Sequence, residues 1–154
     1  MPNWCDNSVT LSHPDKSKVD ALAASLEKED KEFLNHLRPN PAGEWDYGWS
    51  CSNWGTKWDA SDVVVTDESA NQITVIFDTA WTPPTGFYDK MVDLGFDVDA
   101  KYYESGCGFC GRYDESGDTC YEWEDLESAR KTIPKDIDEE FNIIEMMEEW
   151  DEDE

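Results

Sequence analysis

Three of the five cysteines lie near residue 110, where their spacing could support metal or redox chemistry. Cys107 and Cys110 have the C-x₂-C spacing of zinc knuckles and thiol redox motifs, and Cys120 follows ten residues later. A closed zinc site needs four ligands, but the remaining cysteines and both histidines are single residues without ligand spacing. The neighbouring glycines favour a turn that enters a strand. We therefore expect free thiols and no cofactor, with a zinc- or thiol-dependent protein as an alternative.

A second candidate is the segment NWGTKWDASD, residues 53–62, in which Trp54 and Trp58 flank Lys57. A lysine ammonium over an indole ring gains about 0.5–2 kcal/mol, depending on burial, and Gly55 permits a tight turn that lets the rings approach. The segment either fastens a long loop to the sheet or forms a recognition surface, because tryptophan is common at binding hot spots. Both interpretations stay open, and Trp54, Lys57 and Trp58 are candidate partner-binding residues.

The sequence carries no recognisable enzyme signature. No Ser/His/Asp or Cys/His pattern is visible, and no glycine-rich phosphate loop follows a strand. The chain has 37 acidic residues, so a close pair of carboxylates is uninformative about acid–base catalysis. We therefore expect a protein that is not an enzyme.

The net charge of −25 and the isoelectric point near 4.1 bear most directly on function. Such a charge repels nucleic acid and anionic membranes, so we expect no direct binding to either, whereas basic surfaces are attracted. Duplex DNA carries about one charge per 1.7 Å of axis, so 25 charges match roughly 40 Å of duplex. Mimicry of DNA is one interpretation, and an acidic surface that serves solubility is the other.

The sequence also bears on location. No apolar segment approaches the roughly 18 residues that a membrane-spanning helix needs. The first residues, MPNWCDNSV, have neither a basic start nor an apolar stretch, so we expect no secretory signal. An odd number of cysteines fits a cytoplasmic protein with free thiols.

Hydrophobic periodicity predicts the elements that must position these residues. We expect strands at 3–11, 62–68, 71–81 and 96–103, and helices at 12–31 and 82–95. This β-α-β-β-α-β order predicts an α+β, ferredoxin-like (split βαβ) fold, with an antiparallel sheet and two helices on one face. Segments 108–113 and 119–123 predict an additional hairpin that extends the sheet.

Local signals add detail to two of these elements. In the helix at 82–95, Thr82 can cap the first turn, and Leu94 belongs to the apolar stripe just before Gly95 ends the helix. The strand at 96–103 alternates cleanly, which places Tyr103 on a half-exposed side.

Composition divides the chain at about residue 125. We expect a ferredoxin-like domain over 1–124, with a long tryptophan-rich loop of no regular period at 33–60. Residues 125–154 are expected to be an acidic helical extension packed on the same domain, with one amphipathic helix at 136–150. Residues 136–154 hold eleven acids and no Lys or Arg. The candidate partner-binding acids are Asp136, Asp138, Glu139, Glu140, Glu145, Glu148 and Glu149.

Four blocks of sequence resemble a known family. They are, in order, MPNWCDNSVTL, NWGTKWDA, FDTAWTPP and YYESGCGFCGRY. Over roughly residues 2–113 the chain resembles the YubB-like ferredoxin-like domain family of plasmids, phages and bacteria. The resemblance implies the same fold and an accessory protein of a mobile element, without assigned catalytic or binding residues. The acidic extension lies outside the four blocks.

Charge and resemblance together favour a non-enzymatic accessory protein of phage or plasmid type that binds a basic host protein. The expected partner is a nucleic-acid-binding or defence enzyme, inhibited through DNA mimicry. An interaction domain that acts through its tryptophan-rich loop is a further alternative. We expect a monomer or a weak homodimer, because the edge of the added hairpin could pair with a second copy.

Overall fold

The computed structural model describes residues 3–26, 34–35, 38, 40–41, 46–69 and 71–153. Six strands form one antiparallel sheet in the order β2-β3-β1-β4-β5-β6. The strands are β1 (Trp4–Ser12), β2 (Ser61–Ser69), β3 (Gln72–Ala80), β4 (Asp97–Glu104), β5 (Phe109–Asp114) and β6 (Gly117–Glu122). The helices in the described part of the chain are α1 (Lys16–Leu26), α3 (Tyr47–Asn53), α4 (Thr85–Asp93), α5 (Leu126–Thr132), α6 (Lys135–Phe141) and α7 (Ile143–Asp153).

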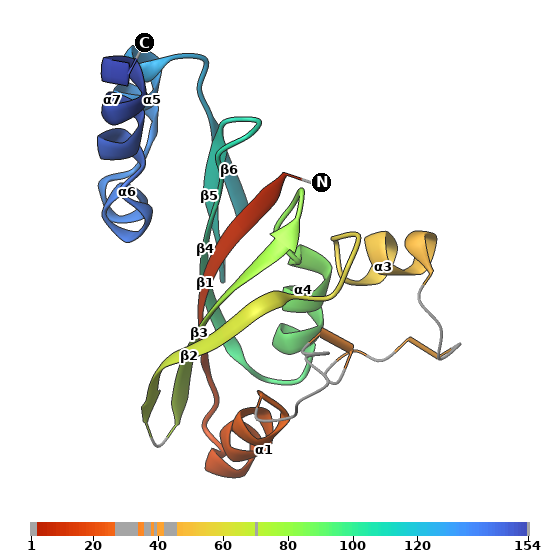
Figure 1. Ribbon diagram of the computed structural model, residues 1–154. Coiled ribbons are helices and arrows are strands. Elements are labelled where there is room, and N and C mark those ends of the chain that lie inside the picture. The colour runs from red at the N-terminus through yellow and green to blue at the C-terminus, as the bar shows by residue number, and fades with distance from the viewer. Residues whose placement is uncertain are drawn as a thin grey trace.

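The predicted ferredoxin-like fold is confirmed. Strand β1 lies at the centre between β3 and β4, and α1 and α4 lie on the same side of the sheet (Figure 1). The β5–β6 hairpin extends the sheet beyond β4, as the sequence predicts.

Alternation along the strands produces the main core. Strand β1 buries every second residue, including Val9 and Leu11, and β3 does the same with Val75. These side chains pack against Leu22 of α1 and Met91 of α4, both buried. Burial of such apolar surface stabilises the fold by roughly 25 cal/mol per Å². The inner face of β1 and β3 is therefore buried under α1 and α4.

The C-terminal helices cover part of the opposite face of the sheet. Ile137 of α6 and Ile143 at the start of α7 are fully buried, and they pack with Tyr103 and Cys110 of β4 and β5. Figure 1 shows α6 and α7 on the side of the sheet opposite to α4. The expectation of a half-exposed Tyr103 is therefore wrong, because this second, smaller core leaves its side chain only 4% exposed.

The single helix expected at 136–150 is also corrected. Asn142 has a left-handed backbone (φ 54°) and ends α6, so α6 and α7 are separate helices. The Asp138 carboxylate accepts a hydrogen bond from the Ile144 backbone N–H at 2.8 Å, which stabilises the break. Asparagine adopts the left-handed conformation more readily than most residues.

Three further local predictions fail. The segment 33–60 contains the helix α3, whose first turn is capped by the Asp46 carboxylate, although much of this segment lies outside the described residues. Thr82 does not cap α4, because its hydroxyl donates instead to the Gly55 carbonyl at 2.7 Å. Leu94 lies outside the buried stripe and is 46% exposed.

The edge strand β2 is irregular. Its pairing with β3 shifts register between Ser61 and Val64 and again between Val65 and Asp67. Asp62, within the first shift, has a positive φ of 54°. Such bulges bend a strand and re-aim its side chains. Among the described residues, no helix is long and apolar enough to cross a membrane.

Candidate functional site

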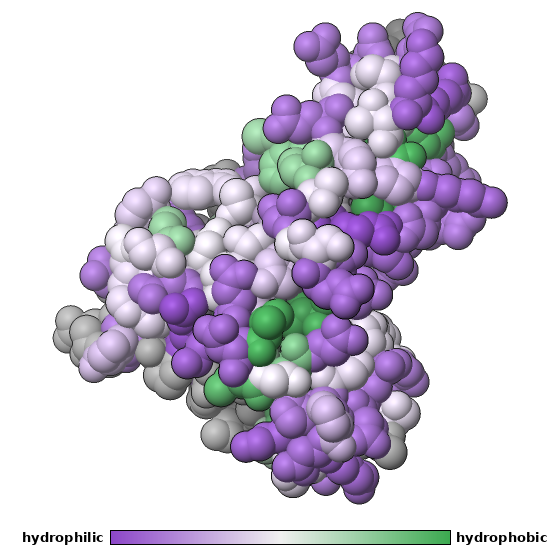
Figure 2. Space-filling model, turned by 180° about the vertical axis from the view of Figure 1, so that it is seen from behind, coloured by the Kyte–Doolittle hydropathy of each residue, from purple (hydrophilic) through white to green (hydrophobic). Residues whose placement is uncertain are grey.

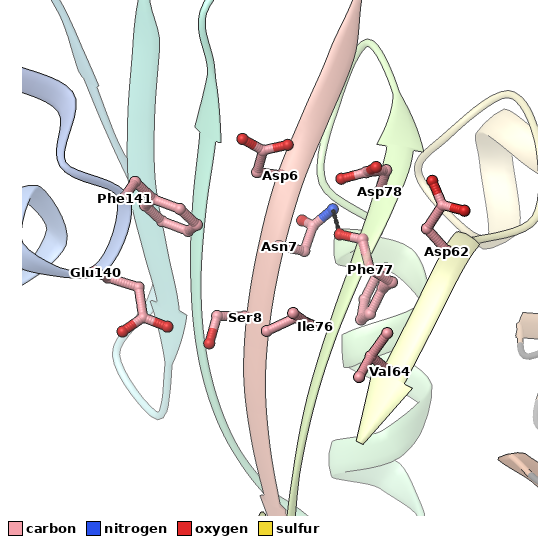
Figure 3. A pocket seen from close by; sticks show the side chains of 10 residues that line it. All are labelled: Asp6, Asn7, Ser8, Asp62, Val64, Ile76, Phe77, Asp78, Glu140 and Phe141. Atoms are coloured by element: carbon pink, nitrogen blue, oxygen red, sulfur yellow. Dashed lines mark hydrogen bonds between the residues drawn. The ribbon is translucent and has the colours of Figure 1, made fainter. Parts of the chain in front are cut away.

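A groove of about 440 Å³ lies on the outer face of the sheet, where the C-terminal helices stop covering it. Strands β1, β2 and β3 form its floor, and α6 contributes residues from the other side (Figure 3). The lining residues are Asp6, Asn7, Ser8, Asp62, Val64, Ile76, Phe77, Asp78, Glu140 and Phe141. Four carboxylates and several apolar side chains therefore share one depression.

Three of the carboxylates come from adjacent strands. Asp6 of β1 pairs directly with Asp78 of β3 in the antiparallel ladder. Figure 3 shows Asp6, Asp78 and Asp62 side by side across the three strands. Like charges directly opposite each other in a sheet are destabilising. The arrangement therefore costs stability unless a proton or a cation is present.

The raised pKa of Asp78 reflects partial burial as well as this repulsion. Partial burial raises its pKa from 3.8 to about 6, together with a hydrogen bond to Asp6 and the negative charges of Asp6 and Asp62. The Asp78 carboxyl is consequently protonated in a sizeable fraction of molecules just below neutral pH. A perturbed carboxyl in a depression is a recognised mark of a functional site.

The apolar part of the groove is open to solvent. Val64 is 50% exposed and Ile76 is 40% exposed, and both point to the outer face. Phe141 is only partly buried and lines the groove from α6. The groove thus combines charge with uncovered hydrocarbon, which suits a ligand that has both.

The structure disperses the C-terminal acids that the sequence proposes as a binding surface. Three of them form ion pairs: Asp136 with Arg112, Glu139 with Lys135 at 3.8 Å, and Glu148 with Arg130 at 2.7 Å. Asp138 accepts the backbone hydrogen bond described above. Glu140 lines the groove, and Glu145 and Glu149 are exposed.

Within the described residues, Lys57 makes cation–π contacts with Trp58 and with Trp81, and not with Trp54. The Lys57 ammonium lies 4.6 Å from the Trp58 ring and 4.7 Å from the Trp81 ring. Trp54 is 4% exposed within the core, and its indole N–H donates to the Arg38 carbonyl at 3.0 Å. Trp54 is thus structural, whereas Lys57 and Trp58 remain partly accessible.

The C-x₂-C segment is organised by a buried carboxylate. Glu104, only 1% exposed, accepts hydrogen bonds from the backbone N–H groups of Gly106 at 2.5 Å and Cys107 at 3.0 Å. A Cβ at Gly111 would overlap the carbonyl of Thr119. Glu104 therefore holds the β4–β5 turn, whereas Gly111 allows β6 to lie close against β5.

The thiols of the block are poor nucleophiles. Burial raises the pKa of Cys110 to about 12, and the hydrogen bond with Glu104 and its charge raise the pKa of Cys107. Burial also raises the pKa of Cys120. Across the described residues, no group of three or more His, Cys, Asp or Glu could hold a metal ion. The geometry gives no support to the zinc alternative.

Sequence reasoning missed Asp6, Asp62 and Asp78. A usable signal exists for two of them, because Asp6 and Asp78 occupy the non-core positions of alternating strands. Their direct opposition depends on the β1–β3 register, which alternation does not give. Asp62 reaches the groove through a bulge that has no sequence signature.

Comparisons with known proteins place the chain at the level of family and fold. A family model described as "Ferredoxin-like domain in Api92-like protein" matches residues 53–152. This match includes α5, α6 and all but the last residue of α7, so the family model extends into the acidic extension, beyond the four blocks. The YubB-like name is not confirmed. No curated protein matches the chain.

A solved structure gives a weak match. It is the crystal structure of protein api92 from Yersinia pseudotuberculosis, at 15% identity and a TM-score of 0.39. The match covers 51% of this chain and 30% of that one.

Proposed function

The chain belongs to the family of ferredoxin-like domains found in Api92-like proteins, and we propose that this member binds a basic partner protein through its acidic surface, without catalysis. The family description names a fold and no activity, so support for the proposal comes from the charges. The partner would be recognised by lysine and arginine side chains on its surface.

The observation that carries the proposal is the acid excess that remains after local pairing. In the described part of the chain, five cations form ion pairs with nearby acids: Lys16, Arg112, Arg130, Lys131 and Lys135. The chain has 12 Lys and Arg against 37 Asp and Glu, so complete pairing would still leave 25 carboxylates unneutralised. Figure 2 shows one face on which hydrophilic residues dominate and hydrophobic ones form small, separate patches. The electrostatic field of the excess carboxylates attracts a basic protein over a distance of about one Debye length.

The finer form of the proposal concerns the class of partner. Proteins that bind nucleic acid present basic surfaces to a polyanion. The net charge of −25 on this chain is comparable to the charge on roughly 40 Å of duplex DNA. A phage- or plasmid-type accessory protein that occupies such a surface would inhibit the partner by mimicry of DNA. The proposal therefore predicts competition between this chain and duplex DNA for one surface.

Affinity capture tests the proposal. The immobilised full chain is exposed to bacterial lysate at low salt, and captured proteins are identified and then eluted with salt or with duplex DNA. We expect basic, nucleic-acid-binding proteins, released by DNA and by an increase from about 0.05 to about 0.5 M salt, because screening weakens surface ion pairs. Capture of no basic protein at low salt would refute the proposal. Elution by salt but not by DNA would refute only the mimicry.

A second candidate surface is the Lys57–Trp81 contact. Trp81 is 40% exposed and the Lys57 ammonium lies over its ring, so part of this contact is at the surface. Under this alternative, Trp81→Ala abolishes capture and Glu145→Gln/Glu149→Gln leaves it intact. Under the acidic-surface proposal, the double variant weakens capture and Trp81→Ala has little effect.

A further inference from the structure

We propose that the groove on the outer sheet face receives an arginine side chain from a basic segment of the partner. This inference rests on the proposed function and names the anchor point within it. The stem of the arginine would lie on Val64 and Ile76, and its guanidinium would lie between Asp6 and Asp78.

The shape of the groove supports an inserted side chain. The helices α6 and α7 cover the outer face over β4 and β5 but leave the face over β1, β3 and β2 uncovered. The cavity of about 440 Å³ lies at this border, with exposed hydrocarbon from Val64 and Ile76 on its floor. Long cationic side chains bury an apolar stem while their charged end reaches polar groups. A small inorganic cation would leave this apolar floor uncovered.

Charge complementarity supports a cation. Asp6, Asp62, Asp78 and Glu140 approach from β1, β2, β3 and α6, and no Lys or Arg is among the lining residues. In the described part of the chain, none of the three aspartates takes part in an ion pair.

Neighbouring groups on β4 do not neutralise the groove. Lys101 lies opposite Ser8 in the ladder but does not line the groove, and Tyr103 lies opposite Asp6 with its side chain buried. The aspartate charges are therefore available to a cation that comes from outside the chain.

Geometry favours arginine over lysine. Asp6 and Asp78 are directly opposed across the ladder, so they present two carboxylates at one place. The planar guanidinium has five N–H donors and can bind carboxylates in pairs, whereas an ammonium is a single point charge. Arginine is also more weakly hydrated, which lowers the cost of its entry beside apolar groups.

The test uses the full chain and four short, flexible peptides that differ only in a central arginine, lysine, citrulline or leucine. Binding is followed by NMR shifts of the Val64 and Ile76 methyl groups and of the aspartate carboxyl carbons. We expect the arginine peptide to shift these groups and to bind about three- to tenfold more tightly than the lysine peptide, because its contacts are charge-assisted and paired. The citrulline and leucine peptides are expected to cause no shift.

Matched variants locate the binding. Asp6→Asn/Asp78→Asn should lower the affinity for the arginine peptide by about tenfold or more, because a pair of charge-assisted hydrogen bonds is lost. Asp67→Asn/Glu68→Gln makes the same charge change on exposed residues of β2 that do not line the groove, and we expect a loss of less than about threefold from the general field. Ile76→Thr, which keeps all charges, should weaken binding by a few fold through loss of apolar contact.

The outcomes separate this inference from the proposed function. Equal losses in the two double variants, or shifts confined to the C-terminal helices, would overturn the groove as the anchor while leaving a basic partner in place. Equal affinity for arginine and lysine would overturn the choice of arginine. If neither cationic peptide binds at low salt and capture of basic proteins also fails, the proposed function falls together with the anchor.

Discussion

Replacement of Asp78 by asparagine removes one charge from the groove while keeping the shape of the side chain. Asp78 is opposed by Asp6 in the ladder, and its pKa is raised from 3.8 to about 6 by partial burial, by the hydrogen bond to Asp6 and by neighbouring charges. Asparagine can keep a hydrogen bond to Asp6. We therefore expect Asp78→Asn to stabilise the folded protein at neutral pH.

The sign follows from proton linkage. Between pH 3.8 and about 6 the folded state holds the Asp78 proton more tightly than the unfolded chain does. The free energy of unfolding therefore falls as pH rises through this window, and the whole cost of the ionised carboxylate is present above it. At 1.36 kcal/mol per pH unit the difference corresponds to about 3 kcal/mol. The groove is open to water and salt, so screening reduces the expected gain to about 1 kcal/mol.

Urea unfolding of both proteins, measured at several pH values, gives the comparison. At about pH 7.5, Asp78→Asn should be more stable by about 1 kcal/mol. The advantage should shrink as the pH falls through the window and vanish below 3.8, where the wild-type carboxyl is protonated in the unfolded state as well. The self-repulsion of the acidic chain changes with pH in both proteins and largely cancels in the difference. Asp67→Asn is the control, because this exposed carboxylate lies outside the groove. A variant that is no more stable at pH 7.5, or whose advantage persists unchanged below pH 3.8, would show that the ionised Asp78 carboxylate does not destabilise the fold.

Three further substitutions and one labelling experiment test the architecture. Gly111→Ala should lower the free energy of unfolding by several kcal/mol, because its Cβ would overlap backbone across the hairpin; thermal unfolding checks this. Glu104→Gln should cost about 1–3 kcal/mol through weaker acceptance of the two part-buried hydrogen bonds of the turn; wild-type stability in urea would contradict it. Ile137→Ala should cost about 2–5 kcal/mol and increase hydrogen exchange in α6 first; uniform loss of protection would argue against this smaller core. Cys110 should resist alkylation in the folded state until denaturant is added, because its thiol is buried and its pKa is raised.

The order of elements and the main core are predictable from the sequence because each is a local property. Alternation in residues 3–11 and 71–81 determines which side chains face inward, and Gly95 ends its helix with a left-handed backbone as predicted. Period and end signals of this kind need no knowledge of distant residues. The ferredoxin-like arrangement follows because few topologies satisfy that order.

The groove depends on relations that no local signal contains. The opposition of Asp6 and Asp78 depends on the register of two strands about 70 residues apart in sequence, and a shift by one residue would turn each side chain to the other face. The same limit explains Tyr103, which alternation leaves exposed and α6 covers. The number of C-terminal acids is visible in the sequence, but their pairing is not: several of them bind nearby cations or backbone N–H groups.

The irregular pairing of β2 has a consequence for self-association. A regular edge strand offers its free backbone groups as a template on which another chain can add a strand. Two register shifts and the left-handed Asp62 interrupt that template along β2, and Asp67 and Glu68 add charge where an incoming chain would lie. Concentrated protein should therefore not extend its sheet from this edge, and a molecule that approaches β2 must rely on side-chain contacts.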